Sequence, residues 1–383
     1  MIKLVSDTIN KQDIASLIEW LSQDEIPQLT KGKLTIQLEE KWANKLGTKY
    51  SVFVNSGSSA ILLTLAALKW TSRLKNFKVV VPSLSWATDL SSPVLLGLEP
   101  ILCDCNLEDL SCDLNKLEQI FEKEKPGALI LVSVLGLVPN MDAVVELCKK
   151  HNVILLEDVC ESMGSKYKGK YLGTFGLASF FSMYFGHHLS TIEGGFINTD
   201  DEDLYYALLM MRSHGWARDL PAHKQLEYNN KYNVDNFKAL YNFYTFGFNL
   251  RSTDLQAFIG LRAIDKLDRF AENRNNNFKY YMANLKNNEL NLRNNEGDFI
   301  SNFAIPVISK DKKTIVKNLI DNQIECRPLI AGDLSQKPFW YDYFGEVYME
   351  NCSKVDEFGF YISNHQDLTK EQIDQIIKIV NNE

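Results

Sequence analysis

The segment 179–200, SFFSMYFGHHLSTIEGGFINTD, places two histidines side by side between two apolar stretches that are typical of buried strands. The chain has 383 residues and only six histidines. An imidazole has an unperturbed pKa of about 6.5, so it can accept and donate protons near neutral pH. His187 and His188 are therefore candidates for general acid–base chemistry. No lysine occurs between Tyr171 and His223, so this turn offers no amine nucleophile.

Three further polar clusters each follow a predicted strand. The sequence NSGSSA after the strand 50–54 supplies the hydroxyls of Ser58 and Ser59 and free backbone amides at a helix start, which is a suitable cradle for a phosphate group. Trp86 lies near the start of the helix that follows the strand 78–82, where its ring could stack on a flat heterocycle. Taken singly, a capped helix without a ligand and a core tryptophan explain these two features at least as well.

Glu157 and Asp158 end the hydrophobic strand 153–158. A carboxylate there could either cap the next helix or pair with a protonated ring nitrogen. Together, the three clusters provide a phosphate cradle, a stacking ring and a carboxylate, and a flat, cationic, phosphorylated heterocycle needs this combination. Pyridoxal 5'-phosphate fits, because its pyridinium nitrogen requires an acidic partner to act as an electron sink.

The elements that position these residues alternate between strand and helix. This alternation predicts an α/β fold with a mostly parallel sheet covered by helices on both faces. Ligands bind such sheets at the carboxyl ends of the strands, where the three clusters would meet. Strands are expected at 50–54, 78–82, 100–105, 128–136 and 153–158, with helices at 58–70, 86–93, 113–124 and 141–152 between them.

The remainder of the chain predicts a second, smaller unit. A polar, aromatic excursion at 220–248 follows the helix 201–215, and excursions of this length usually serve function or partner contact. A long helix is expected at 252–285, capped by Ser252 or Thr253. We expect two domains, 1–270 and 271–383. The first would begin with helices at 11–25 and 35–47, and the second would contain a strand at 302–309 and helices at 310–323 and 369–382.

Composition bounds the class of protein. The net charge of −8 argues against binding to nucleic acid or to an anionic membrane. No basic region followed by an apolar stretch opens the chain, and its longest apolar run, ALILVSVLGLV, is too short to span a bilayer, so we expect a cytoplasmic protein. The seven cysteines form no regular framework, and the spacing of Cys103, Cys105 and Cys112 matches no trusted metal motif. We therefore expect no metal.

The motifs NSGSSA, PSLSWAT, LLEDVCESMG, SFFSMYFGHHLSTIEGG, MRSHGWARD and FGFNLRSTDLQAFIG resemble those of the sugar aminotransferases of the DegT/DnrJ/EryC/StrS family, over nearly the whole chain. The resemblance implies an aspartate-aminotransferase-like three-layer domain and a smaller C-terminal α+β domain. In most of the family, the lysine that holds pyridoxal phosphate follows a serine by five residues and precedes Glu-Gly-Gly. Ser182 and Glu193 keep this register here, and His187 stands at the lysine position.

The resemblance also implies roles for individual residues. His187 would be catalytic, and two chains would form a homodimer in which Asn249 reaches the cofactor phosphate of the neighbouring subunit. The other cofactor-binding residues would be Ser58, Ser59, Trp86, Asp158, Glu161 and Ser182, and the substrate-binding residues would be His188, His214, Arg218, Arg251, Arg327 and His365.

A subgroup of the family with histidine in place of the lysine consists of sugar 3-dehydratases, which segments such as YFGHHLSTIEGG and IECRPLIAGD resemble. The implied reaction uses pyridoxamine 5'-phosphate, held without a covalent bond, to remove the C3 hydroxyl of a nucleotide-linked 4-keto-6-deoxy sugar, with GDP-4-keto-6-deoxymannose favoured. L-glutamate would regenerate the amine form and ammonia would leave, in a pathway to the deoxysugars of lipopolysaccharide O-antigen. Two alternatives stay open: a sugar-nucleotide aminotransferase with an unusual histidine base, and a non-catalytic sugar-nucleotide binder.

Overall fold

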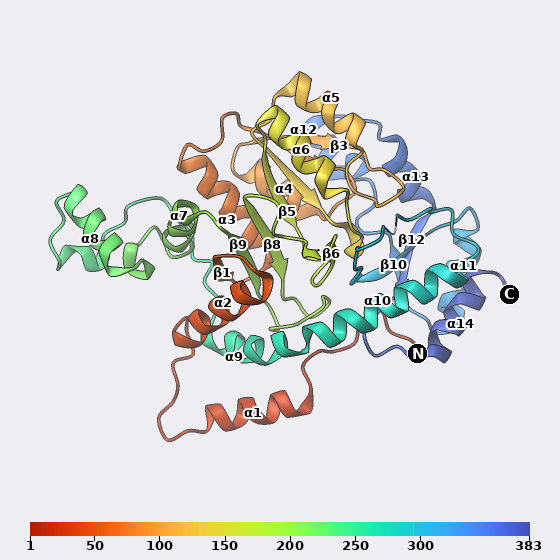
Figure 1. Ribbon diagram of the computed structural model, residues 1–383, viewed down its shortest axis with the longest axis horizontal. Coiled ribbons are helices and arrows are strands. Elements are labelled where there is room, and N and C mark those ends of the chain that lie inside the picture. The colour runs from red at the N-terminus through yellow and green to blue at the C-terminus, as the bar shows by residue number, and fades with distance from the viewer. Residues whose placement is uncertain (294) are drawn as a thin grey trace.

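The computed structural model describes residues 1–293 and 295–383, and its centre is a seven-stranded sheet of order β1-β9-β8-β5-β4-β2-β3 (Figure 1). β9 runs antiparallel to both of its neighbours, and the other strands share one direction. Most of their residues are buried, which explains the continuous hydrophobic runs in the sequence. The strands are β1 (Tyr50–Val54), β2 (Lys78–Pro82), β3 (Glu99–Cys103), β4 (Ala128–Val132), β5 (Ile154–Asp158), β8 (Ala178–Ser182) and β9 (Gly195–Thr199).

Helices pack on this sheet in two groups, which confirms the predicted α/β class. α3 contacts α4, α7 and the strands β8 and β9, whereas α5 and α6 pack on one another and on β3 and β5. None of the described helices is both long and apolar enough to cross a membrane. The helices of this unit are α2 (Lys33–Leu46), α3 (Gly57–Trp70), α4 (Ala87–Leu95), α5 (Leu114–Glu124), α6 (Met141–His151), α7 (Glu202–Arg212) and α9 (Asp254–Ala263).

The C-terminal unit is built on a three-stranded antiparallel sheet of order β10-β12-β11. α10 (Leu267–Asn284) leads into this unit, so the domain boundary expected at 270/271 falls inside one helix and stays a prediction. β10, α11 and α14 lie where the sequence predicted a strand and two helices, whereas β11, β12, α12 and α13 were not predicted. The elements are β10 (Ala304–Ile308), α11 (Lys312–Asp321), β11 (Cys326–Pro328), α12 (Pro338–Phe344), α13 (Glu350–Phe358), β12 (Gly359–Ser363) and α14 (Lys370–Val380).

The single helix predicted at 252–285 is divided in the structure. A short 3₁₀ turn at Ile264–Lys266 separates α9 from α10. Thr253, rather than Ser252, is the cap of α9. Its Oγ1 accepts the N–H of Gln256 at 3.2 Å, and Gln256 Oε1 accepts the N–H of Thr253 at 3.1 Å. This reciprocal capping box fixes the start of α9.

Two apolar surfaces are left outside the core. α1 (Lys11–Leu21) forms as predicted, but Ile14, Ile18 and Leu21 on its apolar face are exposed, Ile18 by 59%. Several aromatic side chains of the excursion 220–248, such as Phe237, Tyr241 and Phe246, are exposed too, in an arm that carries α8 (Ala222–Lys231) away from the body of the protein (Figure 1). Apolar areas of this kind are suited to contact with another chain.

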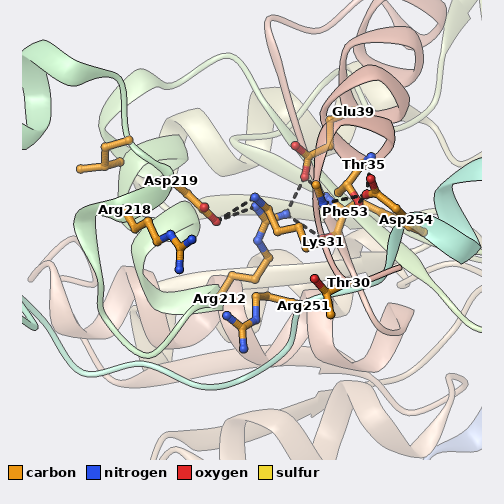
Figure 2. Close-up of polar contacts among 12 residues, drawn as sticks. Thr30, Lys31, Thr35, Glu39, Phe53, Arg212, Arg218, Asp219, Arg251 and Asp254 are labelled. Atoms are coloured by element: carbon orange, nitrogen blue, oxygen red, sulfur yellow. Dashed lines mark hydrogen bonds and ion pairs between the residues drawn. The ribbon is translucent and has the colours of Figure 1, made fainter. Parts of the chain in front are cut away.

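A buried cluster of charges ties the end of α7 to α2 and β1 (Figure 2). The side chain of Arg212 is almost fully buried, with Nη1 at 2.5 Å from Glu39 Oε1 and Nη2 at 3.4 Å from Asp219 Oδ2. Arg212 also donates to the carbonyl oxygen of Phe53, whose own N–H donates to Glu39. Lys31 extends the cluster through its ion pair with Asp219, at 3.0 Å. The predicted site residues His214 and Arg218 directly follow α7, and Asp219 of the cluster is next to Arg218. The cluster therefore fixes the segment that carries them.

Removal of Arg212 should destabilise the protein strongly, because Glu39 would stay buried without a cationic partner. We expect Arg212→Leu to lower the free energy of unfolding by about 3–5 kcal/mol, measured by urea denaturation. Lys150→Met is the matched control, since it breaks an exposed ion pair with Glu118 and should cost less than about 1 kcal/mol. Equal losses for the two variants would show that the buried cluster does not stabilise the fold.

Candidate active site

A cavity of about 500 Å³ lies at the carboxyl edge of the large sheet. Its wall combines the loops after β1, β2, β5 and β8 with Phe303 and Tyr361 of the C-terminal unit. Among the described residues, no lysine lines it. The structure brings six of the predicted site residues together there, namely Ser58, Trp86, Asp158, Glu161, Ser182 and His187.

The loop after β1 has the properties of a phosphate cradle. Ser56 is the N-cap of α3, and its Oγ accepts the N–H of Ser59 at 3.1 Å. Ser58 Oγ lies 3.1 Å from the hydroxyl of Thr88 in the first turn of α4, so two helix N-termini meet there. A Cβ on Gly57 would lie only 3.0 Å from Cys160 Sγ in the loop after β5, so the close packing at this position favours glycine. Ser56 and Ser58 line the cavity, whereas the predicted Ser59, whose Oγ accepts the hydroxyl of Ser56 at 3.0 Å, does not.

Two buried acids, one at the end of β5 and one just after it, form the floor of this cavity. Asp158 accepts the N–H of Cys160 at 2.9 Å, and Glu161 accepts the N–H of Leu135 at 2.8 Å. Burial raises the pKa of both carboxyl groups, that of Glu161 to about 8. Neither acid forms an ion pair with any of the described residues. A cavity with such a floor fits a ligand that carries positive charge, as a protonated pyridine ring does.

Glu157 points away from the cavity, because successive side chains of a strand alternate between its two faces. Its carboxylate accepts the N–H groups of Gly173, Phe175 and Gly176, each at 2.7 Å. It therefore anchors the loop that leads into β8. Of the two acids that the sequence left open, Asp158 is the one in the cavity.

Trp86 and Ser182 complete the cofactor-sized part of the cavity. Trp86 is the N-cap residue of α4, and its side chain is 60% exposed. A large exposed ring beside buried acids is available to stack on a flat heterocycle. Ser182 ends β8, and its Oγ accepts the N–H of Tyr184 at 3.3 Å. Pyridoxal phosphate therefore fits the residues present, with a cradle, a stacking ring and an acidic floor.

His187 and His188 point to opposite sides of the turn. His187 lines the cavity, with the ring of Phe303 5.4 Å away. Burial, with a smaller effect of the Arg274 charge, lowers the pKa of His187 to about 4, so its imidazole is neutral at pH 7. His188 is fully buried, and its Nε2 lies 2.7 Å from the carbonyl oxygen of Ser301. His188 does not line this cavity in the described chain, so a substrate contact stays a prediction without support from these contacts, which indicate a structural role.

A second cavity, of about 440 Å³, collects Arg218, Asn249 and Arg251. Arg251 Nε donates to Asn249 Oδ1 at 3.0 Å, and Arg251 Nη2 lies 3.5 Å from Nε2 of His214. Lys31 adds another cation to its wall (Figure 2). In the described chain these residues do not line the first cavity. One chain thus holds the predicted residues in two separate groups, an acidic one and a basic one.

Arg327 and His365 belong to the C-terminal unit. Arg327 is exposed on β11 and lies opposite Tyr361, which lines the first cavity. His365 is buried, and its Nδ1 accepts the N–H of Asp367 at 3.3 Å. In the described chain His365 lines neither cavity. A substrate contact stays a prediction for Arg327 and has no support for His365.

Asp104, beside the predicted cysteine cluster, joins the loop after β3 to the C-terminal unit. Cys105 lies near Asp104 and Cys352 in an arrangement that could hold a metal ion. However, the Asp104 carboxylate already accepts the N–H groups of Asn351 and Cys352 at the start of α13, and Lys116 Nζ lies 2.6 Å from it. These contacts cap α13 on the loop after β3.

Sequence reasoning missed several residues of the first cavity, among them Asp89, Phe303 and Tyr361. The last two come from the C-terminal unit, and no local pattern connects them to strand ends far away in the chain. Asp89 had a signal, because it lies one helical turn after Trp86 in the segment that follows β2.

Comparison with known proteins shows the class to which this fold and site belong. The model of the DegT/DnrJ/EryC1/StrS aminotransferase family matches residues 7–381. The chain belongs to this family, which confirms the resemblance seen in its motifs.

Particular relatives narrow the class further. The chain is similar to the GDP-4-keto-6-deoxy-D-mannose 3-dehydratase of Yersinia pseudotuberculosis, with 34% identity over 98% of this chain and 97% of that protein. It is 33% identical to the protein of the same name from Escherichia coli O55:H7, over 92% of each. A crystal structure of GDP-4-keto-6-deoxymannose-3-dehydratase with a trapped PLP–glutamate geminal diamine matches with a TM-score of 0.88 and 31% identity, over 99% of this chain and 100% of that one.

The raised pKa of Glu161 should make the cofactor-free protein lose stability as pH rises. The folded-state pKa of about 8 exceeds the ordinary value of 4.5, so Glu161 contributes stability that is complete below pH 4.5 and lost by pH 8. Within this window each pH unit corresponds to at most about 1.4 kcal/mol. Glu161→Gln should flatten this slope, as measured by denaturant unfolding between pH 4.5 and 8.

Glu40→Gln, which removes an exposed carboxyl group of α2, controls for the change in net charge. The prediction fails if Glu161→Gln and the wild-type protein lose stability in parallel over the whole window.

Proposed function

We propose that this protein is a 3-dehydratase that binds pyridoxal or pyridoxamine 5'-phosphate without a covalent bond and removes the C3 hydroxyl of GDP-4-keto-6-deoxymannose. L-glutamate restores the amine form, and ammonia leaves. One observation carries the proposal: the cavity that fits this cofactor contains His187 and, among the described residues, no lysine. An enzyme that must release the amine from its sugar has no use for a lysine that would displace it.

The cofactor supplies an amine for the 4-keto group and a ring that accepts electrons. The residues of the chain bind and orient it. The N-terminus of α3, with Ser58 and Ser182, holds the phosphate, while Trp86 stacks on the ring. Asp158 holds the proton on the ring nitrogen, and Glu161 approaches the ring hydroxyl.

His187 moves the protons of the reaction. Its neutral imidazole takes a proton from the carbon atom attached to the ring and delivers a proton to the departing C3 oxygen. The lowered pKa of about 4 keeps the base form available throughout the neutral range. The apolar side chain of Phe303 beside it limits access of water to the reacting atoms.

The substrate and the glutamate step rest on the relatives. Two curated proteins that are 33% and 34% identical are named for GDP-4-keto-6-deoxy-D-mannose. The structure at TM-score 0.88 holds glutamate joined to PLP. Because the family is described as aminotransferases, the second candidate is transfer of the amine to the sugar. The fate of the nitrogen decides between the two.

The proposal includes a cytoplasmic homodimer with shared sites. Arg218, Asn249 and Arg251 form a basic cavity that is separate from the acidic one in a single chain. A cofactor phosphate and a nucleotide diphosphate both need cations. The exposed apolar face of α1 and the aromatic arm offer surfaces for the contact. A partner would add the basic group of one chain to the acidic cavity of the other.

With GDP-4-keto-6-deoxymannose, glutamate and cofactor, the wild-type protein should give a 3-deoxy sugar and free ammonia. His187→Asn should lower the rate by about 10²-fold or more but leave cofactor affinity unchanged, because the phosphate and ring contacts lie elsewhere. Mass spectrometry of the product and an ammonia assay provide the measurement. Nitrogen retained on the sugar would instead establish the aminotransferase.

His188→Asn is the matched control for this experiment. It should lower the melting temperature, because His188 is buried and bonded to Ser301, and affect the rate of the folded protein less. A normal rate in His187→Asn together with an inactive, folded His188→Asn would move the base to His188.

Shared sites can be tested by mixing two inactive variants. His187→Asn damages the acidic cavity, and the double variant Asn249→Ala/Arg251→Ala damages the basic one. After subunit exchange at equal amounts, about a quarter of the wild-type rate should return, because half of the dimers are mixed and each has one intact site. A mixture that stays inactive while exchange is demonstrated would refute a site shared between chains.

A further inference from the structure

Asp89 is a buried acid of the first cavity to which the proposed mechanism gives no task. It stands in the first turn of α4, where its N–H donates to the carbonyl oxygen of Trp86 at 3.1 Å. Its side chain is fully buried and lines the cavity. Neither carboxyl oxygen has a hydrogen-bond partner that is fixed as a donor among residues 1–293 and 295–383. A buried acid without such a partner is costly, so its neighbours must explain it.

The groups that face Asp89 are Ser85, Asp158, Cys160 and Glu161. All are neutral or acidic, and Asp89 forms no ion pair with a described residue. The carboxyl groups of Asp89 and Asp158 are close enough to share a hydrogen bond. Two carboxylates in contact cannot both ionise, so one of them holds a proton. That proton supplies the missing donor.

The proton belongs on Asp89. Burial, together with the charge of Asp158, raises the pKa of Asp89 well above the ordinary value. Burial also raises the pKa of Asp158, but the N–H of Cys160 and the hydrogen bond from Asp89 oppose this rise. Asp158 is thus the carboxylate of the pair and Asp89 the acid.

We propose that Asp89 is a positioning residue of the cofactor site, which donates its O–H to the Asp158 carboxylate and fixes the orientation in which that carboxylate meets the protonated ring nitrogen. The inference rests on the proposed function, since it assumes that the cofactor binds in this cavity. The pair then carries one negative charge against one positive charge. Because Asp89 and Trp86 start the same helix, α4 aligns the stacking ring and the acid together.

A simpler role as a helix-capping acid does not fit Asp89. Asp113 and Asp201 have that role at α5 and α7, where each accepts backbone N–H groups of the first turn. Asp89 accepts no backbone N–H among the described residues, and it faces Asp158 instead. Asp89 therefore contributes its carboxyl group to the cavity and does not cap the helix.

The test compares two substitutions at this position. Asp89→Asn keeps a donor to Asp158, and Asp89→Leu removes it at similar size. We expect Asp89→Asn to bind pyridoxal phosphate within about threefold of the wild-type affinity. Asp89→Leu should bind at least about tenfold more weakly, the usual effect of losing one hydrogen bond to a charged group. Equilibrium dialysis measures the affinity.

A second readout follows the ring nitrogen itself. With ¹⁵N-labelled cofactor bound, the nitrogen should stay protonated at neutral pH in the wild-type protein and in Asp89→Asn. In Asp89→Leu it should lose its proton at lower pH, because the Asp158 carboxylate is no longer held toward it. Ser92→Ala, a buried change on the same helix, controls for packing of α4 and should leave both readouts unchanged.

The outcomes separate this inference from the proposed function. A wild-type protein that does not bind pyridoxal phosphate overturns the proposed function and this inference with it. If the wild-type protein binds and Asp89→Leu matches it in affinity and in nitrogen protonation, the inference alone is overturned. The same holds if Asp89→Asn fails as severely as Asp89→Leu.

A double variant keeps the test decisive even if Asp89→Leu does not fold. Asp89→Ala also removes the donor. Because Asp89 acts through Asp158, adding Asp89→Ala to Asp158→Asn should change neither affinity nor nitrogen protonation further. Effects that add independently in this cycle would overturn the inference.

Discussion

The burial of acidic groups around the end of β5 is the constraint on which the site depends. Asp89, Asp158 and Glu161 share one cavity, and burial raises the pKa of each. Buried acids are stable only when they are neutral, hydrogen-bonded or paired with a cation. The described chain offers hydrogen bonds and shared protons to these acids but no cationic partner. Such a cavity is completed by a positively charged ring, which is why its acids and its ligand must be understood together.

The same constraint explains the effect of a histidine at the lysine position: it keeps a cationic side chain away from the buried acids. A lysine there would bring a permanent cation to the cavity and could pair with Asp158 or Glu161. The imidazole of His187 brings none, because burial holds its pKa near 4. The acids therefore remain available to the ring, and the base remains unprotonated. One substitution thus changes both the attachment of the cofactor and the electrostatics of its site.

Much of the large unit could be predicted because its signals are local. Strands of the parallel sheet are continuous apolar runs, and strand ends converge on one edge, so Ser58, Trp86 and Asp158 could be grouped from sequence alone. The short strands β11 and β12 and the helices α12 and α13 carry weak periodicity, and packing within the C-terminal unit determines them. α1 shows a further limit. Its apolar face was readily found, but a pattern of apolar residues does not distinguish a face buried in the core from one that stays exposed, as Ile14 and Ile18 do.

The predicted residues that the structure does not place at the cavity, and the cavity residues that sequence reasoning missed, differ in physical cause. His188 and His365 are buried and form hydrogen bonds with backbone groups. The sequence of a motif does not distinguish such a structural histidine from a catalytic or substrate-binding one. Phe303 and Tyr361 reach the cavity only through the docking of the second unit. Asp89 was overlooked because an acid in the first turn of a helix is ordinarily explained by its favourable interaction with the positive end of the helix dipole.

The separation of charge in one chain has a thermodynamic consequence under the proposed homodimer. Acids lie around the first cavity and Arg218 and Arg251 around the second, while a phosphorylated, cationic cofactor carries both signs. A ligand that bridges the two groups must stabilise the association of the chains, and association must raise the affinity for the ligand by the same factor. The exposed faces of α1 and of the aromatic arm then need not hold the dimer by themselves. Cofactor and partner would complete each other's binding sites.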